Sequence, residues 1–206
     1  MLTKEEIKII DLFRKDLFRS YTIREIMKRT SKKSYPWTFN SVRKMEKMGL
    51  IDMAKKGYSN ICSLSLDNSY TITYLAFLDE LEANSRKLPR DNIIQLINAV
   101  PLSYFTFMVA GSYAAGKATE KSDIDVVVLA EDGTETKKIL TILKNKGELM
   151  VPEAHPYVFT KTEFLNMLLN EEQNYGKLIF KNRIIFFGAE NYYLIVKKAI
   201  KNGFKG

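Results

Sequence analysis

Two apolar segments joined by a glycine-serine pair and two closely spaced acids constrain the fold of this chain more than any other feature. Residues 103–110 (SYFTFMVA) are rich in β-formers and run directly into Gly111 and Ser112. Ten residues follow, and then Asp123-Ile124-Asp125 leads into residues 126–129 (VVVL). This order predicts a buried strand, a short helix that opens at Gly111, and a second buried strand with acidic residues at its start.

The glycine-serine bend has the features of a phosphate-binding turn. A helix that begins after a strand leaves backbone N–H groups without partners, and an anion can accept hydrogen bonds from them. Gly111 has no side chain to block close approach of the backbone, and the Ser112 hydroxyl can supply one more hydrogen bond. We therefore expect a phosphate-bearing ligand at this bend.

The two aspartates indicate a divalent cation. Residues i and i+2 of a strand point to the same face, so Asp123 and Asp125 are expected to project together while Ile124 faces the core. Two neighbouring carboxylates repel each other unless a cation binds between them. Ligands that are all oxygen favour Mg²⁺, or Mn²⁺, over zinc.

The pattern Val109-Ala110-Gly111-Ser112 followed by Asp123-Ile124-Asp125-Val126 resembles the DNA polymerase β-like nucleotidyltransferase superfamily. It is most similar to the minimal nucleotidyltransferases of prokaryotes. The resemblance implies a mixed β-sheet flanked by helices over residues 91–206. It also implies transfer of a nucleoside monophosphate from an NTP, with ATP as the expected substrate, to an acceptor hydroxyl. Catalysis and metal binding would fall on Asp123 and Asp125, and nucleotide binding on Gly111 and Ser112. Minimal nucleotidyltransferases often act on a partner protein in toxin–antitoxin pairs, so a protein acceptor is implied as well.

The third metal ligand of this superfamily is a carboxylate on a later strand, and here three alternatives stay open. Residues 151–159 (VPEAHPYVF) form the expected strand, and Thr160 and Glu163 have the spacing of a capping box that begins the next helix. His155, the single histidine, stands where the family carries its acid, and Glu153 lies two residues earlier. Either Glu153 is the ligand, or His155 is a ligand or base, or the third position is absent and the domain binds nucleotide without catalysis. The prolines at 152 and 156 favour an edge strand.

The first third of the chain carries the net charge. Residues 1–66 hold 15 Lys and Arg against 7 Asp and Glu, while the other 140 residues hold 17 of each sign. The charge of +8 therefore belongs to one segment, which suggests a module that faces a polyanion beside a module that does not.

This basic segment has the element order of a DNA-binding module. Helices are expected at residues 4–18, from the Thr22–Glu25 capping box, and from Pro36 to Met48, followed by strands at 50–53 and 61–66. Three helices and a hairpin with a basic tip resemble the winged helix-turn-helix of prokaryotic regulators, over residues 1–68. Double-stranded DNA is then the expected partner. The candidate DNA contacts are Trp37, Asn40, Ser41, Lys44, Lys47, Lys55 and Lys56, with base edges read by Asn40 and Ser41. Docking to a protein is the alternative function of such a module.

Residues 69–90 are expected to join the two modules by a helix, which either bridges domains or pairs with its copy in a homodimer. The chain is thus predicted to be a two-domain protein of the α+β or α/β class. One cysteine excludes a disulfide framework, and no apolar run approaches the roughly 18 residues that cross a bilayer. The charged first residues lack the apolar stretch of a signal peptide. These features predict a cytoplasmic protein without a membrane partner. The rival to an enzyme is a DNA-binding regulator whose second domain only senses nucleotide.

Overall fold

The computed structural model describes all residues from 1 to 206 and divides them into two compact units, Met1–Leu78 and Asp79–Gly206. The division falls inside the helix α4 (Ser69–Ser85), so this helix contributes its first part to one unit and its second part to the other. No helix of the chain has both the length and the apolar character needed to cross a bilayer.

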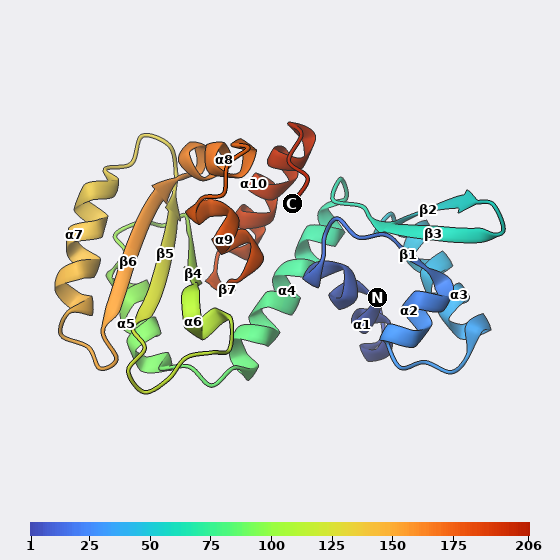
Figure 1. Cartoon of the computed structure of the whole chain (residues 1–206), viewed down its shortest axis with the longest axis horizontal. Coiled ribbons are helices and arrows are strands. Elements are labelled where there is room, and N and C mark those ends of the chain that lie inside the picture. Colours follow the sequence, from blue (N-terminus) through green and yellow to red (C-terminus); the bar gives the residue numbers. More distant parts are fainter. The chain divides into compact units, whose positions relative to one another are not determined.

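The first unit consists of helices and a small antiparallel sheet (Figure 1). Its elements before α4 are α1 (Lys4–Lys15), β1 (Tyr21–Thr22), α2 (Ile23–Arg29), α3 (Tyr35–Lys47), β2 (Ile51–Lys56) and β3 (Ser59–Leu64). The strands are ordered β1-β3-β2, and β2 and β3 form a hairpin. The core is made of fully buried side chains from every helix and from both longer strands: Ile9, Ile10, Phe13, Ile26, Val42, Met45, Leu50, Ile51, Cys62 and Leu75.

Local signals set the ends of these elements. Thr22 and Glu25 form the capping box expected from the sequence, and Ser34 caps α3 just ahead of Pro36. Gly49 ends α3 with a positive φ of 70°, a conformation that costs glycine little. The hairpin strands are longer than expected because Lys56 pairs directly with Ser59, which leaves only two residues in the turn.

The second unit is built around a four-stranded mixed sheet. Its elements after α4 are α5 (Arg90–Ala99), β4 (Phe105–Val109), α6 (Gly111–Ala114), β5 (Ile124–Ala130), α7 (Thr136–Gly147), β6 (Ala154–Thr160), α8 (Lys161–Leu169), α9 (Tyr175–Lys181), β7 (Ile184–Phe187) and α10 (Ala189–Lys201). The order is β6-β5-β4-β7, in which β5 and β6 are parallel and the other neighbours antiparallel. The prediction of a mixed sheet flanked by helices is confirmed for this unit.

Helices cover both faces of this sheet (Figure 1). Alternate residues of β5, among them Ile124, Val126 and Val128, pack into one core with α5 and α7. The residues between them, from Asp125 onward, point to the opposite face, where α8 and α10 contact the sheet. Asp125 is thus held on a strand whose buried neighbours fix its direction.

Two further sequence predictions are confirmed at β6 and α8. The strand β6 is at the edge of the sheet, as its prolines suggested, and the Thr160–Glu163 capping box begins α8 as expected. The helix α5 has no side-chain cap at its start. That helix begins at Arg90 after Pro89, so Asp91 lies inside its first turn and makes no cap hydrogen bond.

Candidate functional site

The residues singled out in the second unit meet at one end of the sheet, where β4 ends and β5 and β6 begin. Backbone hydrogen bonds hold the three segments in register: the Ala110 N–H donates to the Asp125 carbonyl and the Ile124 N–H donates to the Glu153 carbonyl, each at 2.8 Å. In the parallel ladder Asp125 lies opposite His155. Residues as far apart in the sequence as Ala110 and His155 therefore share one sheet end.

Gly111 and Asp125 are in direct contact. Gly111 begins α6 with a positive φ of 61°, and a Cβ built on it would stand 1.9 Å from Oδ2 of Asp125. No other residue type fits this bend while Asp125 keeps its position. The bend at Gly111 and Ser112 and the Asp125 carboxylate therefore form one compact arrangement.

The environment of Asp125 disfavours its charge. Burial raises the pKa of its carboxyl group, His155 opposes this shift, and the nearby Asp123 carboxylate adds to it. A cation placed beside Asp123 and Asp125 would offset the repulsion between them and favour the ionised form of both carboxylates.

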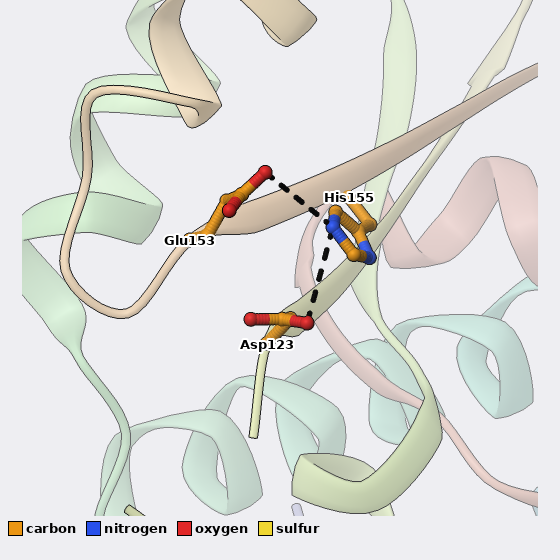
Figure 2. A group of neighbouring side chains, drawn as sticks. All are labelled: Asp123, Glu153 and His155. Atoms are coloured by element: carbon orange, nitrogen blue, oxygen red, sulfur yellow. Dashed lines mark ion pairs between the residues drawn. The ribbon is translucent and has the colours of Figure 1, made fainter. Parts of the chain in front are cut away.

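Of the two aspartates, Asp123 is the one that lies in a group with Glu153 and His155. The three side chains converge from the start of β5 and the start of β6 (Figure 2). Nε2 of His155 is 3.9 Å from Oδ2 of Asp123 and 3.6 Å from Oε1 of Glu153, and one ligand atom from each residue lies within 4.8 Å of the other two. Each side chain is about half exposed, at 48%, 47% and 49% for Asp123, Glu153 and His155.

The donor set fits a divalent cation. Two carboxylates and one imidazole that face a common point are a usual ligand combination for such ions in proteins. Of the alternatives that the sequence left open, Glu153 and His155 both stand beside Asp123. Asp125 does not belong to this group of three and points instead toward Gly111.

A cavity of about 510 Å³ opens beside Glu153 and His155. It follows β6 as far as Phe159 and is bounded on the α7 side by Leu140 and Lys144. Tyr157, two residues beyond His155, lines it and is 38% exposed. The volume is within the range of small-ligand sites.

Tyr175 is a residue near this site that the sequence did not single out. Its ring packs on Tyr157 at a centroid distance of 4.6 Å, and its hydroxyl is buried without a hydrogen-bond partner. Burial raises the pKa of this hydroxyl, and the negative charge of Asp125 raises it further. In the sequence, Tyr175 is only a tyrosine at the start of the helix that follows α8, and such a residue does not by itself indicate a place near a functional site.

The predicted DNA-contacting residues of the first unit divide into two sets. Asn40, Lys47, Lys55 and Lys56 are exposed. Trp37 is half-buried beneath the Lys32 ammonium, which lies 4.8 Å from its ring. Lys44 donates to Oε2 of Glu6 at 2.8 Å and to the Met1 carbonyl at 3.1 Å, so its charge is paired within the unit.

The expectation that Ser41 faces a DNA groove is wrong. Ser41 is only 4% exposed and shares the buried side of α3 with Thr38, Val42 and Met45. The inward stripe is wider than the apolar residues alone indicated, because α3 packs against both α2 and β2. Arg43 is exposed instead and pairs with Glu46 at 2.8 Å. The spacing of residues 40, 43 and 47 places it on the same face of the helix as Asn40 and Lys47.

The match to a protein family lies within the second unit. Residues 105–183, which span β4 to α9 and contain the whole site, match the family model of the nucleotidyltransferase domain. A solved structure described as a toxin–antitoxin crystal structure with AMP-PNP is 19% identical, with a TM-score of 0.41 over 56% of this chain and 86% of that chain. No curated protein matches the chain.

Proposed function

We propose that this protein transfers a nucleoside monophosphate from an NTP to an acceptor hydroxyl and releases pyrophosphate. The observation that carries the proposal is the convergence of Gly111, Asp123 and Asp125 at one sheet end inside a segment that matches the nucleotidyltransferase domain. A phosphate-binding bend beside paired carboxylates is what phosphoryl and nucleotidyl transfer require, because most of the catalysis is positioning and charge neutralisation.

In this proposal each residue has a distinct part. The backbone N–H groups after Gly111 and the Ser112 hydroxyl hold the outer phosphates. Asp123 and Asp125 bind Mg²⁺ or Mn²⁺, with Glu153 and His155 next to Asp123. The bound cation supplies charge neutralisation of the triphosphate and lowers the pKa of the attacking hydroxyl. The strand β5 holds Asp125 beside the bend, and Asp123 directly precedes the first residue of this strand.

The acceptor is proposed to be a hydroxyl on a partner protein. This follows from the resemblance of the Gly-Ser and Asp-Ile-Asp pattern to the minimal nucleotidyltransferases, which often modify the partner in a toxin–antitoxin pair. ATP is the proposed donor on the same ground.

The test is label transfer from α-³²P ATP with Mg²⁺ and a cell extract that supplies acceptors. We expect label on a macromolecule with the whole protein, and none with the Asp123→Asn/Asp125→Asn variant or after addition of EDTA. The double variant removes both ligand charges while it keeps side-chain volume, so its fold can be checked by circular dichroism. Mass spectrometry of the labelled product identifies the acceptor hydroxyl.

A different outcome favours the rival function. Suppose that the original protein and the double variant bind labelled ATP with the same affinity and that neither transfers label. The second unit is then a nucleotide sensor, and the transferase proposal fails. If the double variant transfers as well as the original protein, the aspartates are not the metal ligands and the assigned site is wrong.

We also propose that the first unit is a winged helix that binds double-stranded DNA. The helix–helix–helix–hairpin order, the charge of +8 and the exposed Lys47, Lys55 and Lys56 support this proposal. Asn40 and Arg43 on α3 are exposed as well and are proposed to reach base edges or phosphates, although Arg43 also pairs with Glu46 at 2.8 Å.

A salt titration of duplex binding tests the DNA proposal. The Lys55→Ala/Lys56→Ala variant should bind the duplex more weakly than the original protein. The magnitude of the slope of log K against log salt should fall by roughly 1 to 2, because each lost phosphate contact lowers it by about 0.9. Lys137→Ala/Lys138→Ala, an exposed pair on α7 with the same charge loss, is the control and should leave the slope unchanged. Equal effects of both pairs, or no binding at low salt, would contradict the proposal.

A further inference from the structure

The group of Asp123, Glu153 and His155 differs from an all-carboxylate magnesium site in one respect, which is the imidazole nitrogen at its centre. Nε2 of His155 is the atom that both carboxylates approach (Figure 2). We propose that these three residues bind a divalent transition-metal ion through Nε2 of His155 and one oxygen of each acid, and that the site prefers Mn²⁺ to Mg²⁺. This deepens the proposed function by naming the class of metal, but the binding itself requires no transfer.

The geometry is suited to one ion. The separations of 3.6 and 3.9 Å, with all three ligand atoms inside 4.8 Å, describe a triangle of atoms. A point equidistant from its corners lies roughly 2 to 2.5 Å from each atom, close to the ~2.0–2.2 Å bonds that imidazole nitrogen and carboxylate oxygen make to divalent metals. Small rotations of exposed side chains are enough to close the remaining difference.

The backbone supports this convergence. Ile124, between Asp123 and Asp125, donates its N–H to the Glu153 carbonyl, so the starts of the two strands are tied together at the site. Glu153 and His155 are two residues apart at the start of the edge strand β6, and the carboxylates of Glu153 and Asp123 both approach the His155 imidazole. Three ligands from two hydrogen-bonded strands leave the other coordination positions open to solvent, a nucleotide or an acceptor.

The ligand chemistry decides which ions bind well. Mg²⁺ prefers oxygen ligands and keeps several of its waters, so an imidazole ligand adds little to the affinity of the site for Mg²⁺. Transition metals accept imidazole readily, and for a given N/O site their affinity rises from Mn²⁺ toward Cu²⁺. Mn²⁺ also accepts carboxylates, so a site of two acids and one histidine suits it. The two acids supply enough charge to balance a divalent ion.

The simplest alternative needs no metal. A protonated His155 would itself attract Asp123 and Glu153 and hold the same three side chains together. The two explanations differ in one measurable respect, since only the metal site puts a nitrogen nucleus in direct contact with an added ion.

Electron spin-echo spectroscopy of Mn²⁺ added to the nucleotide-free whole chain makes this measurement. His155 is the only histidine in the sequence, so after removal of any histidine tag a directly coordinated imidazole ¹⁴N signal comes from this residue. We expect one bound Mn²⁺ with ¹⁴N modulation, and at least a tenfold excess of Mg²⁺ over Mn²⁺ for half displacement. Bound Mn²⁺ without nitrogen modulation, equal competition by Mg²⁺, or no binding would each overturn the proposal.

Two variants sharpen the result. His155→Asp should keep a bound ion, lose the nitrogen signal and lose the preference for Mn²⁺. Glu153→Gln should weaken Mn²⁺ binding about tenfold or more. Loss of a residue that only hydrogen-bonds to a metal ligand already lowers metal affinity about 10- to 100-fold, and Glu153 is proposed to be a ligand itself. Glu120→Gln, an exposed acid outside the group of three, is the control and should change nothing.

The outcome is independent of the transfer assay. Nitrogen-coordinated Mn²⁺ in a protein that transfers no label would sustain this inference while the proposed function fails. Label transfer by a protein whose bound Mn²⁺ shows no nitrogen contact would sustain the proposed function while this inference fails.

Discussion

Replacing Gly111 by alanine should lower the rate of nucleotide transfer at least about 100-fold. The added Cβ would stand 1.9 Å from Oδ2 of Asp125, so either the carboxylate or the bend must move. Displacements of about 1 Å in a positioned reacting group cost on the order of 100-fold in rate. Label transfer per unit time, measured at saturating ATP and Mn²⁺ or Mg²⁺, is the readout.

Backbone strain must be separated from this clash. Gly111 has a positive φ of 61°, and alanine in that conformation destabilises a protein by about 1 kcal/mol or more regardless of its neighbours. Gly133→Ala is the matched control, because Gly133 has a φ of 83° but no atom within 4 Å of the added Cβ. We expect both variants to lose similar stability and only Gly111→Ala to lose transfer. Normal transfer by Gly111→Ala would mean that Asp125 and the bend do not act together.

Much of the second unit could be predicted because its signals are local. The Gly-Ser bend, the acids at the start of β5 and the Thr160–Glu163 capping box each depend on residues a few positions apart. Counting back from that capping box put His155 on the strand next to β5, and the ladder does pair it with Asp125. The mixed sheet could be expected from the family resemblance, whereas its strand order could not be read from any local pattern.

Contacts between residues that are distant in the sequence explain the positions that could not be predicted from it. Ser41 looked exposed on a helical wheel, but α3 is packed on two sides, and a wheel shows only where apolar residues lie. Lys44 looked free to bind phosphate, but Glu6, 38 positions earlier, is brought beside it. Tyr175 could not be associated with Asp125 because the loop and helix that bring it there carry no motif.

A buried polar cluster far from the Gly-Ser bend in the sequence stabilises the second unit. Arg183, directly before β7, lies over the ring of Tyr192 with its guanidinium carbon 4.4 Å from the ring centroid, and its Nε is buried. Burial opposes the charge of Arg183, but Tyr192, Tyr193 and Asp79 outweigh it and raise the pKa of the guanidinium. Asp79, on α4, is 4% exposed. The cluster thus fixes the second part of α4 to β7 and α10.

Arg183→Met should reduce the free energy of unfolding of the second unit by about 3–5 kcal/mol, because it removes a buried cation whose charge interacts with the buried Asp79 carboxylate. Arg86→Met, which breaks the more exposed Arg86–Glu82 pair just beyond α4, should cost less than about 1 kcal/mol. Urea denaturation followed by far-UV circular dichroism measures both losses. Fluorescence of the single tryptophan, Trp37, reports the first unit in the same samples.

The double variant Asp79→Leu/Arg183→Met decides whether charge balance is the cause. If it is, removing both charges should recover most of the stability lost in Arg183→Met, since apolar groups of similar volume replace a buried ion pair at little cost. If packing of the arginine stem on Tyr192 is the cause, the double variant should be at least as unstable as the single one. A loss below about 1 kcal/mol in Arg183→Met itself would mean that Asp79 is balanced by another group, and that the cluster does not hold α4 in place.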